Sequence, residues 1–304
     1  MIFRNLEWEC FGLNINGEKL NHLRFADDIV LFSESENYLE QMLQQLANES
    51  AKAGLQINAS KTKILTNSSG TAGPIVVNNE TVEYVTEYIY LGQLITPRNN
   101  MKKEIDRRIC NTWKRYCSLS EIMKNPEISI GMKRKVYNTC ILPCLTYGCQ
   151  TWALTDHLSE KVKGCQNSID RSVIGVWRRD KVTLENIKSQ TKFKNAHKLC
   201  QKQKWKWTGH ILREKKEKWT NTVTEWYPRD GKRRKGRQIR RWEDDFKRIA
   251  GPDWMRVARD RIRWKSLEED DFKRIAGPDW MRVARDQIKW KSFEEAFVER
   301  QITS

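Results

Sequence analysis

The sequence predicts an α+β fold in which antiparallel hairpins and one helix are followed by a mostly α-helical part and a basic C-terminal region. In residues 1–95, short apolar runs separated by turn residues alternate with one helical pattern. From Met101 onward, apolar residues recur at helical spacing. The chain has 304 residues, enough for about two domains, so a sizeable core can form.

The first predicted hairpin carries two adjacent carboxylates. The apolar runs at residues 22–26 and 29–32 flank Asp27 and Asp28, which we place at the tip of a tight turn. Residues 33–36 have the form of a capping box and begin a helix. The buried face of this helix is predicted from residues at helical spacing, namely Leu39, Met42, Leu43, Leu46 and Ser50.

Several short strands are expected after this helix. Asn78, Asn79 and Glu80 separate two of them as a hairpin turn, and Pro97 marks the end of the strand-rich part. The predicted strands are residues 55–58, 63–65, 75–77, 81–85 and 88–95.

Helices dominate the rest of the prediction. Ile105, Ile109, Trp113 and Tyr116 form one apolar stripe, with Lys and Arg on the opposite face. Further helices are expected at residues 129–141, 156–175 and 184–217. We divide the chain into three parts, at residues 1–95, 96–180 and 181–304.

The last part contains a tandem duplication. Residues 243–268 recur at residues 269–294, and the two copies differ at three positions: Arg261/Gln287, Arg263/Lys289 and Leu267/Phe293. A working solenoid generally needs three or more copies, so we interpret the pair as a duplication of one helical element. Its tryptophans, such as Trp254 beside Val257 and Ala258, are expected in the core.

The net charge of +17 is unevenly distributed along the chain. Residues 1–95 carry 6 basic and 12 acidic side chains, whereas residues 96–199 carry 21 and 9. Residues 200–242 carry 15 and 4, and residues 243–304 carry 14 of each sign. The acidic part can gather cations, and the basic parts can hold polyanions.

Targeting features are lacking in the sequence. No stretch approaches the roughly 18 apolar residues of a membrane span, and residues 1–9 have no signal-peptide pattern. An intracellular protein, nuclear or cytoplasmic, is therefore expected, with its eight cysteines as reduced thiols. Cys144, Cys149, His157 and Cys165 do not have the spacing of a compact zinc site.

Asp27 and Asp28 are the most specific chemical feature. Adjacent carboxylates can help to hold hard divalent cations, and two such ions clamp the attacking and leaving oxygens in nucleotidyl transfer. Ordinary turn chemistry is the alternative, because Asp favours turns.

Three motifs occur in order: LRFADDIVLFS at residues 23–33, GLQINASKTK at residues 54–63 and YLGQLI at residues 90–95. They resemble the metal-binding core, the following palm motif and the primer grip of reverse transcriptases of non-LTR (LINE-type) retrotransposons. The resemblance is closest to lineages that encode an apurinic-type endonuclease ahead of the polymerase. It extends over essentially the whole chain, through residues 145–152, 204–210, 231–237 and 241–242.

The resemblance implies an RNA-directed DNA polymerase fold, with a truncated palm at residues 1–95, a helical thumb-like region and a basic C-terminal region. Asp27 and Asp28 match the metal ligands for Mg²⁺, and Asp27 is the more direct of the two. The implied partners are RNA and DNA, as template and primer. The resemblance leaves the oligomeric state open.

Two further motifs carry implied roles. Lys61 matches a palm lysine that acts as general acid toward pyrophosphate, although a solvated turn lysine is the alternative. Tyr90, Leu91 and Gly92 match the primer grip, although a buried strand with a glycine kink has the same pattern.

One departure from the family bears on catalysis. The family uses a third carboxylate from an aspartate well upstream, but Asp27 is the first aspartate of this chain. Glu7, Glu9 and Glu18 precede it outside any matching motif, and the fingers have no counterpart. We therefore expect a C-terminal fragment that binds Mg²⁺ weakly and is inactive alone.

A basic region rich in tryptophan suits nucleic-acid binding. Bases stack on aromatic rings while Lys and Arg neutralise phosphates. Core packing of the tryptophans is one alternative, and a nuclear localisation patch or a solvated loop is another for residues 231–237. The candidate contact residues are Lys204, Trp205, Lys206, Trp207, Lys232, Arg233, Arg234, Lys235 and Arg237.

Three functions remain open from the sequence. The first is a nucleic-acid-binding fragment of a LINE-type reverse transcriptase. The second is a non-catalytic binding or architectural protein derived from the element. The third is a decayed open reading frame without a selected role.

Overall fold

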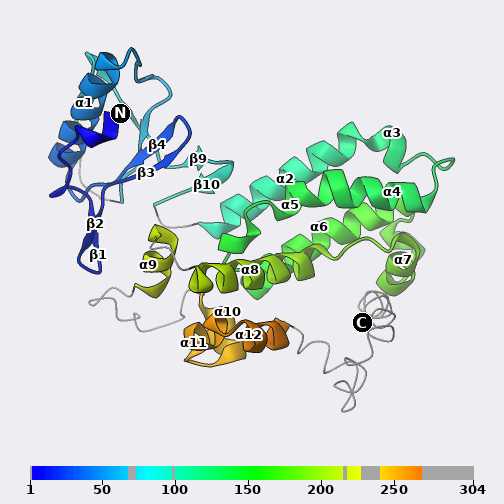
Figure 1. Ribbon diagram of the computed structural model, residues 1–304. Coiled ribbons are helices and arrows are strands. Elements are labelled where there is room, and N and C mark those ends of the chain that lie inside the picture. Colours follow the sequence, from blue (N-terminus) through cyan, green and yellow to red (C-terminus); the bar gives the residue numbers. More distant parts are fainter. Residues whose placement is uncertain (1, 68–72, 98–99, 215–217, 227–239, 269–304) are drawn as a thin grey trace. The chain divides into compact units, whose positions relative to one another are not determined.

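A computed structural model describes residues 2–67, 73–97, 100–214, 218–226 and 240–268. The chain forms two compact units, and each is described by itself (Figure 1). Unit 1 comprises residues 1–100 and 215–233, and unit 2 comprises residues 101–214 and 234–304. Outside the described residues lie the second repeat copy and five of the predicted contact residues, Lys232, Arg233, Arg234, Lys235 and Arg237.

Unit 1 combines one long helix with small two-stranded sheets. Four of the described strand pairs are antiparallel, whereas β5 and β8 pair in parallel, a departure from the wholly antiparallel prediction. Its elements are η1 (Ile2–Arg4), β1 (Leu13–Ile15), β2 (Glu18–Leu20), β3 (His22–Phe25), β4 (Asp28–Leu31), α1 (Glu36–Lys52), β5 (Lys63–Ile64), β6 (Val76–Val77), β7 (Glu80–Thr81), β8 (Glu83–Tyr84), β9 (Tyr88–Tyr90), β10 (Gln93–Ile95) and α9 (Trp219–Glu225).

Turn residues explain where these strands end. The predicted hairpin between β6 and β7 is confirmed, but its turn has two residues, Asn78 and Asn79, both with positive φ, and Glu80 begins β7. Leu91 and Gly92 also have positive φ, so residues 88–95 form a hairpin and not the single strand that was predicted. Residues 55–58 were predicted as a strand and are irregular.

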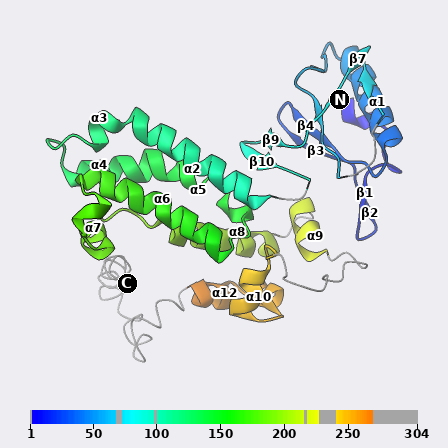
Figure 2. The same ribbon diagram turned by 180° about the vertical axis from the view of Figure 1, so that it is seen from behind.

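Helix α1 organises the core of unit 1 (Figure 2). Of its predicted face, Met42, Leu43, Leu46 and Ser50 are buried, so the helical spacing is confirmed. Leu43 packs with Ile64, Ile75 and Val77, whereas Met42 and Leu46 pack with Trp8. The helix thus fixes both β4 and the strands that follow it.

Unit 2 is helical in its described residues. The apolar stripe predicted from Ile105 to Tyr116 lies on α2 and faces the core, as expected. The elements are α2 (Met101–Ser118), α3 (Ser120–Met123), α4 (Ile130–Val136), η2 (Tyr137–Ile141), α5 (Leu142–Thr146), η3 (Cys149–Thr151), α6 (Asp156–Ile174), η4 (Arg178–Asp180), α7 (Leu184–Thr191), α8 (Ala196–Arg213), α10 (Asp244–Ala250), α11 (Trp254–Arg259) and α12 (Arg261–Glu268).

The predicted helix at 184–217 is two helices. Lys192 ends α7 in the left-handed conformation, with φ of +50°. The Asn195 side chain then caps α8, because its Oδ1 accepts a hydrogen bond from the amide of Lys198 at 2.9 Å. The predicted division near residue 180 does not separate compact units, since α8 packs against α5, α6 and η3.

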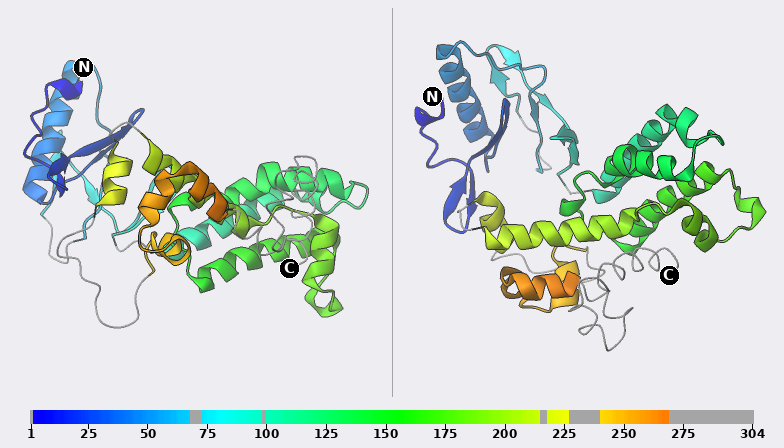
Figure 3. Two further views of the ribbon diagram at one scale, coloured as in Figure 1. Left: turned by 60° about the horizontal axis from the view of Figure 1, so that its bottom comes forward. Right: turned by 45° about the vertical axis from the view of Figure 1, so that its right-hand side comes forward.

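Helix α8 lies between two hydrophobic clusters (Figure 3). On one side, Ala196 and Cys200 join the core of α2, α5 and α6. On the other, Trp205 and Leu212 join a cluster from the first repeat copy. Trp254 and Ala258 are buried there, which confirms the expected packing of this copy. No helix in the described ranges combines the length and apolarity of a membrane span.

Candidate active site and nucleic-acid interface

The carboxylate hairpin is formed by β3 and β4, which pair from His22 opposite Leu31 to Phe25 opposite Asp28. The two turn residues are therefore Ala26 and Asp27, whereas Asp28 is the first residue of β4. This register corrects the prediction that both carboxylates lie at the tip. Ala26 has φ of +52°, a conformation that costs energy for a residue with a Cβ atom.

The two faces of this hairpin have different surroundings. Directly opposite residues share a face, so His22 and Leu31 lie on one face and Phe25 and Asp28 on the other. The His22 ring stacks on Phe3 at 4.9 Å between centroids, and Leu31 packs near α1. Asp28 is thus directed away from this core, and both carboxylates are exposed.

The charge of Asp28 acts on the side chain of Tyr90. Burial raises the pKa of the Tyr90 phenol, and the nearby carboxylate of Asp28 raises it further. The two hairpins are therefore near enough for the charge of Asp28 to act on the Tyr90 phenol. Leu91 and Gly92 form the β9–β10 turn, with φ of +46° and +73°. A positive φ is uncommon for leucine, so the turn holds strain at this motif.

Lys61 lies in a separate turn. Its amide donates a hydrogen bond to Asn58 Oδ1 at 3.0 Å, and its side chain is exposed. No hydrogen bond or ion pair joins Lys61 to Asp27 or Asp28 among the described residues.

The metal-binding capacity of the site rests on two carboxylates. Among the described residues, no three His, Cys, Asp or Glu side chains gather as metal ligands. Mg²⁺ is commonly held by one or two carboxylates together with substrate phosphates. Asp27 and Asp28 fit that role with a phosphate present but do not enclose an ion themselves.

Two predicted nucleic-acid contacts are buried in α8. Lys204 is 5% exposed, and its ammonium donates to Asp245 at 2.7 Å. Trp205 is 8% exposed, and its ring packs at 5.3 Å from Phe246 and 4.0 Å from Trp264. These residues hold α8 to the repeat helices, so the prediction that they contact nucleic acid directly is corrected.

The exposed face of α8 carries the other two predicted residues. Lys206 is exposed, and Trp207 is 39% exposed with its ring 6.1 Å from that of His210. Residues at i and i+4 share a helix face, so Lys198, Lys202, Lys206 and His210 form one row, the α8 basic stripe. The prediction missed Lys198, Lys202 and His210, although their spacing of four residues was visible in the sequence.

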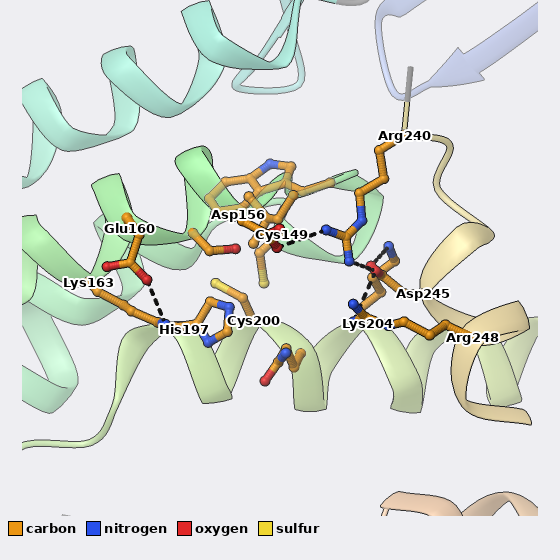
Figure 4. A pocket seen from close by; sticks show the side chains of 14 residues that line it. Cys149, Asp156, Glu160, Lys163, His197, Cys200, Lys204, Arg240, Asp245 and Arg248 are labelled. Atoms are coloured by element: carbon orange, nitrogen blue, oxygen red, sulfur yellow. Dashed lines mark hydrogen bonds and ion pairs between the residues drawn. The ribbon is translucent and has the colours of Figure 1, made fainter. Parts of the chain in front are cut away.

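A pocket of about 300 Å³ opens beside α8 within unit 2 (Figure 4). On one wall, Asp245 accepts from Lys204 and, at 2.6 Å, from Arg240. On the other, the buried thiols of Cys149 and Cys200 lie together, which raises the pKa of Cys200. All eight cysteines are free thiols in this structure. The wall contacts of Asp245 are structural, because they attach α10 to α8.

Comparison with known proteins identifies the class of the first unit. Residues 2–95 match the family described as reverse transcriptase (RNA-dependent DNA polymerase). That range contains the carboxylate hairpin, Lys61 and Tyr90, the residues that the motifs had singled out.

A second similarity extends over most of the chain. An uncharacterized transposon-derived protein of Caenorhabditis elegans is 34% identical over 275 residues, which cover 84% of this chain and 97% of that protein. The chain therefore belongs to the reverse transcriptase family through residues 2–95, and over most of its length it is related to this transposon-derived protein. No solved structure matches it.

Proposed function

We propose that this chain is a nucleic-acid-binding protein derived from a LINE-type retrotransposon reverse transcriptase, and that it does not extend a primer by itself. The observation that carries the binding proposal is the α8 basic stripe with Trp207 beside it. Family membership makes RNA and DNA the partners to test first.

The dimensions of the stripe suit a phosphate backbone. From residue 198 to residue 210, an α-helix rises about 18 Å at 1.5 Å per residue. Successive lysines on this row lie one helical turn apart, and each can neutralise a phosphate, while the exposed Trp207 ring offers a stacking surface. The basic segment at residues 229–237 adds charge close along the chain.

The catalytic part of the proposal rests on the ligands of the metal site. Asp27 and Asp28 would hold Mg²⁺ with the phosphates of a bound nucleotide, and the ion would supply charge neutralisation there. The two-ion site of the family uses a third carboxylate, and the described residues bring none to this hairpin. Tyr90 beside Asp28 supports a retained primer-grip position.

Binding and catalysis are tested on the same purified protein. We expect single-stranded RNA to bind with a log-log salt slope of about −0.7 per neutralised phosphate. Replacing both Lys202 and Lys206 by Ala should flatten the slope by about 1.4. The matched control removes two exposed lysines of α2, Lys102 and Lys114, and should keep the slope of the parent protein.

The same samples are incubated with primed poly(rA), dTTP and Mg²⁺, and no incorporation is expected. Incorporation that Asp27→Ala abolishes would overturn the inactive assignment. If the stripe variant kept the slope and affinity of the parent, the binding assignment of α8 would be withdrawn. The second basic segment is then tested by replacing Lys232, Arg233, Arg234 and Lys235 by Ala. If all four contact phosphates, the log-log salt slope should flatten by roughly three.

A further inference from the structure

One surface of α8 is shaped to receive the first repeat copy. The indole of Trp264 lies against Gly209 so closely that a Cβ atom there would be 2.6 Å from the ring. Its Nε1 donates to the backbone oxygen of Trp205 at 2.9 Å. Gly209 therefore permits a contact that any larger residue would prevent.

Polar contacts fix the position of the repeat on this surface. Asp245 accepts from Lys204 at 2.7 Å, and the backbone oxygen of Ala258 accepts from Arg213 Nη1 at 2.8 Å. Between these contacts, Phe246 and Trp254 are almost completely buried. We call the receiving residues the α8 docking surface: Lys204, Trp205, Gly209, Leu212 and Arg213.

Every residue of the first copy that makes these contacts has an identical counterpart in the second copy. Of the three positions that differ, Arg261 and Arg263 are exposed in the first copy, and Leu267 is partly buried. Since the differences avoid the fully buried positions, the second copy keeps the whole set of docking side chains. The counterparts are Asp271, Phe272, Trp280, Ala284 and Trp290.

We propose that residues 269–294 are a second ligand for the α8 docking surface, and that the two copies exchange on it within one chain. The surface accommodates one copy at a time, because both copies would place a tryptophan against Gly209. When the second copy is docked, the connection from α8 lengthens from residues 214–242 to residues 214–268. The basic residues at 229–237 then lie within a longer connection.

The residues that precede each copy decide which one is docked more often. Arg240 donates to Asp245 at 2.6 Å, and the ring of Trp242 lies 4.9 Å from that of Phe246. The second copy has Ser266 and Glu268 at the corresponding places. The connection to the second copy is nearly twice as long, and the greater entropy cost of closing it lowers the occupancy of the second copy by about 2.5-fold. The first copy is therefore the major occupant.

Full-length variants and hydrogen exchange test the proposal. We expect Trp290→Ala to leave the protection of α8 amides at residues 205–212 unchanged. In Trp264→Ala, the second copy docks in place of the first, so α8 loses only part of its protection. In the double variant, with both Trp264→Ala and Trp290→Ala, the protection of the α8 amides should fall at least about a hundredfold, as expected for truncation of a buried tryptophan.

A second readout separates exchange from simple loss of packing. In Trp264→Ala, amides of residues 280–290 should gain protection relative to the parent protein, while those of residues 254–264 lose it. Unchanged exchange at residues 280–290, or the same α8 loss in Trp264→Ala as in the double variant, would overturn the proposal. In the same exchange measurement, unchanged protection of the α2 and α6 amides establishes that these helices remain folded in each variant.

Discussion

Two neighbouring tryptophans of α8 have opposite expected roles, which makes them a sharp test of the interface. Trp207 is 39% exposed and Trp205 only 8%, so Trp207→Ala should lower the free energy of unfolding clearly less than Trp205→Ala does. If a base stacks on its ring, the same change should weaken RNA binding by about 1–3 kcal/mol. That loss corresponds to roughly a 5- to 150-fold higher Kd.

Trp205 is the matched comparison on the buried side. Its ring is enclosed by Phe246 and Trp264, so Trp205→Ala should destabilise the fold by about 3–5 kcal/mol through loss of buried area and creation of a cavity. Any loss of RNA binding in this variant should follow the fraction of unfolded protein.

Urea denaturation followed by circular dichroism measures stability, and fluorescence anisotropy with a labelled single-stranded RNA measures affinity across a salt series. Trp207 carries no charge, so Trp207→Ala should lower affinity without changing the salt slope. A Trp207→Ala protein that bound RNA as the parent does would refute stacking on this ring. A Trp205→Ala protein of unchanged stability would refute its assignment to the core.

Two further predictions concern titratable groups. Burial raises the pKa of Asp170 to about 7 from its ordinary 3.8, so the native state keeps a proton that the unfolded chain releases between these values. Stability should therefore fall as pH rises from about 4 to 7, by up to about 4 kcal/mol, and Asp170→Asn should abolish this dependence in urea denaturation at pH 5 and pH 8. Replacing Asp28 by Asn should lower the pKa of Tyr90, which remains above its ordinary value because burial is the larger cause, as NMR titration of labelled tyrosine would record; an unmoved Tyr90 would contradict the proximity of the two hairpins.

Features specified by local sequence were predictable. The buried face of α1 and the stripe of α2 follow from apolar spacing alone, because a helix that packs on one side needs only that pattern. The position of the carboxylate hairpin in the sequence was predicted correctly, but its turn lies one residue earlier than predicted. The reason is that Ala26 adopts a left-handed conformation, which no glycine or asparagine in the sequence indicated. Gly92 was such a signal for the β9–β10 turn and was interpreted only as a kink.

Features that depend on distant segments were not predictable. Lys204 and Trp205 have the composition of a binding surface, but Asp245 and Trp264 lie far along the chain and cover them. A helix packed on two sides presents only a narrow exposed row, and which row that is depends on both partners. Packing thus decides that Lys206 and Trp207 remain accessible while Lys204 and Trp205 do not, and the sequence alone does not contain that information.

The same distinction governs the carboxylate site. A two-residue turn and its flanking strands form from adjacent residues, so the hairpin of Asp27 and Asp28 needs little more than its own sequence and the packing of Leu31 near α1. A site for two metal ions instead needs a carboxylate from another segment, at a position that only tertiary packing sets. The described residues supply Tyr90 from another hairpin but no third acidic ligand. Retention of the local motif is therefore a poor measure of polymerase activity, whereas charge on the α8 basic stripe acts without any such assembly, and RNA binding is the function that this fold supports most directly.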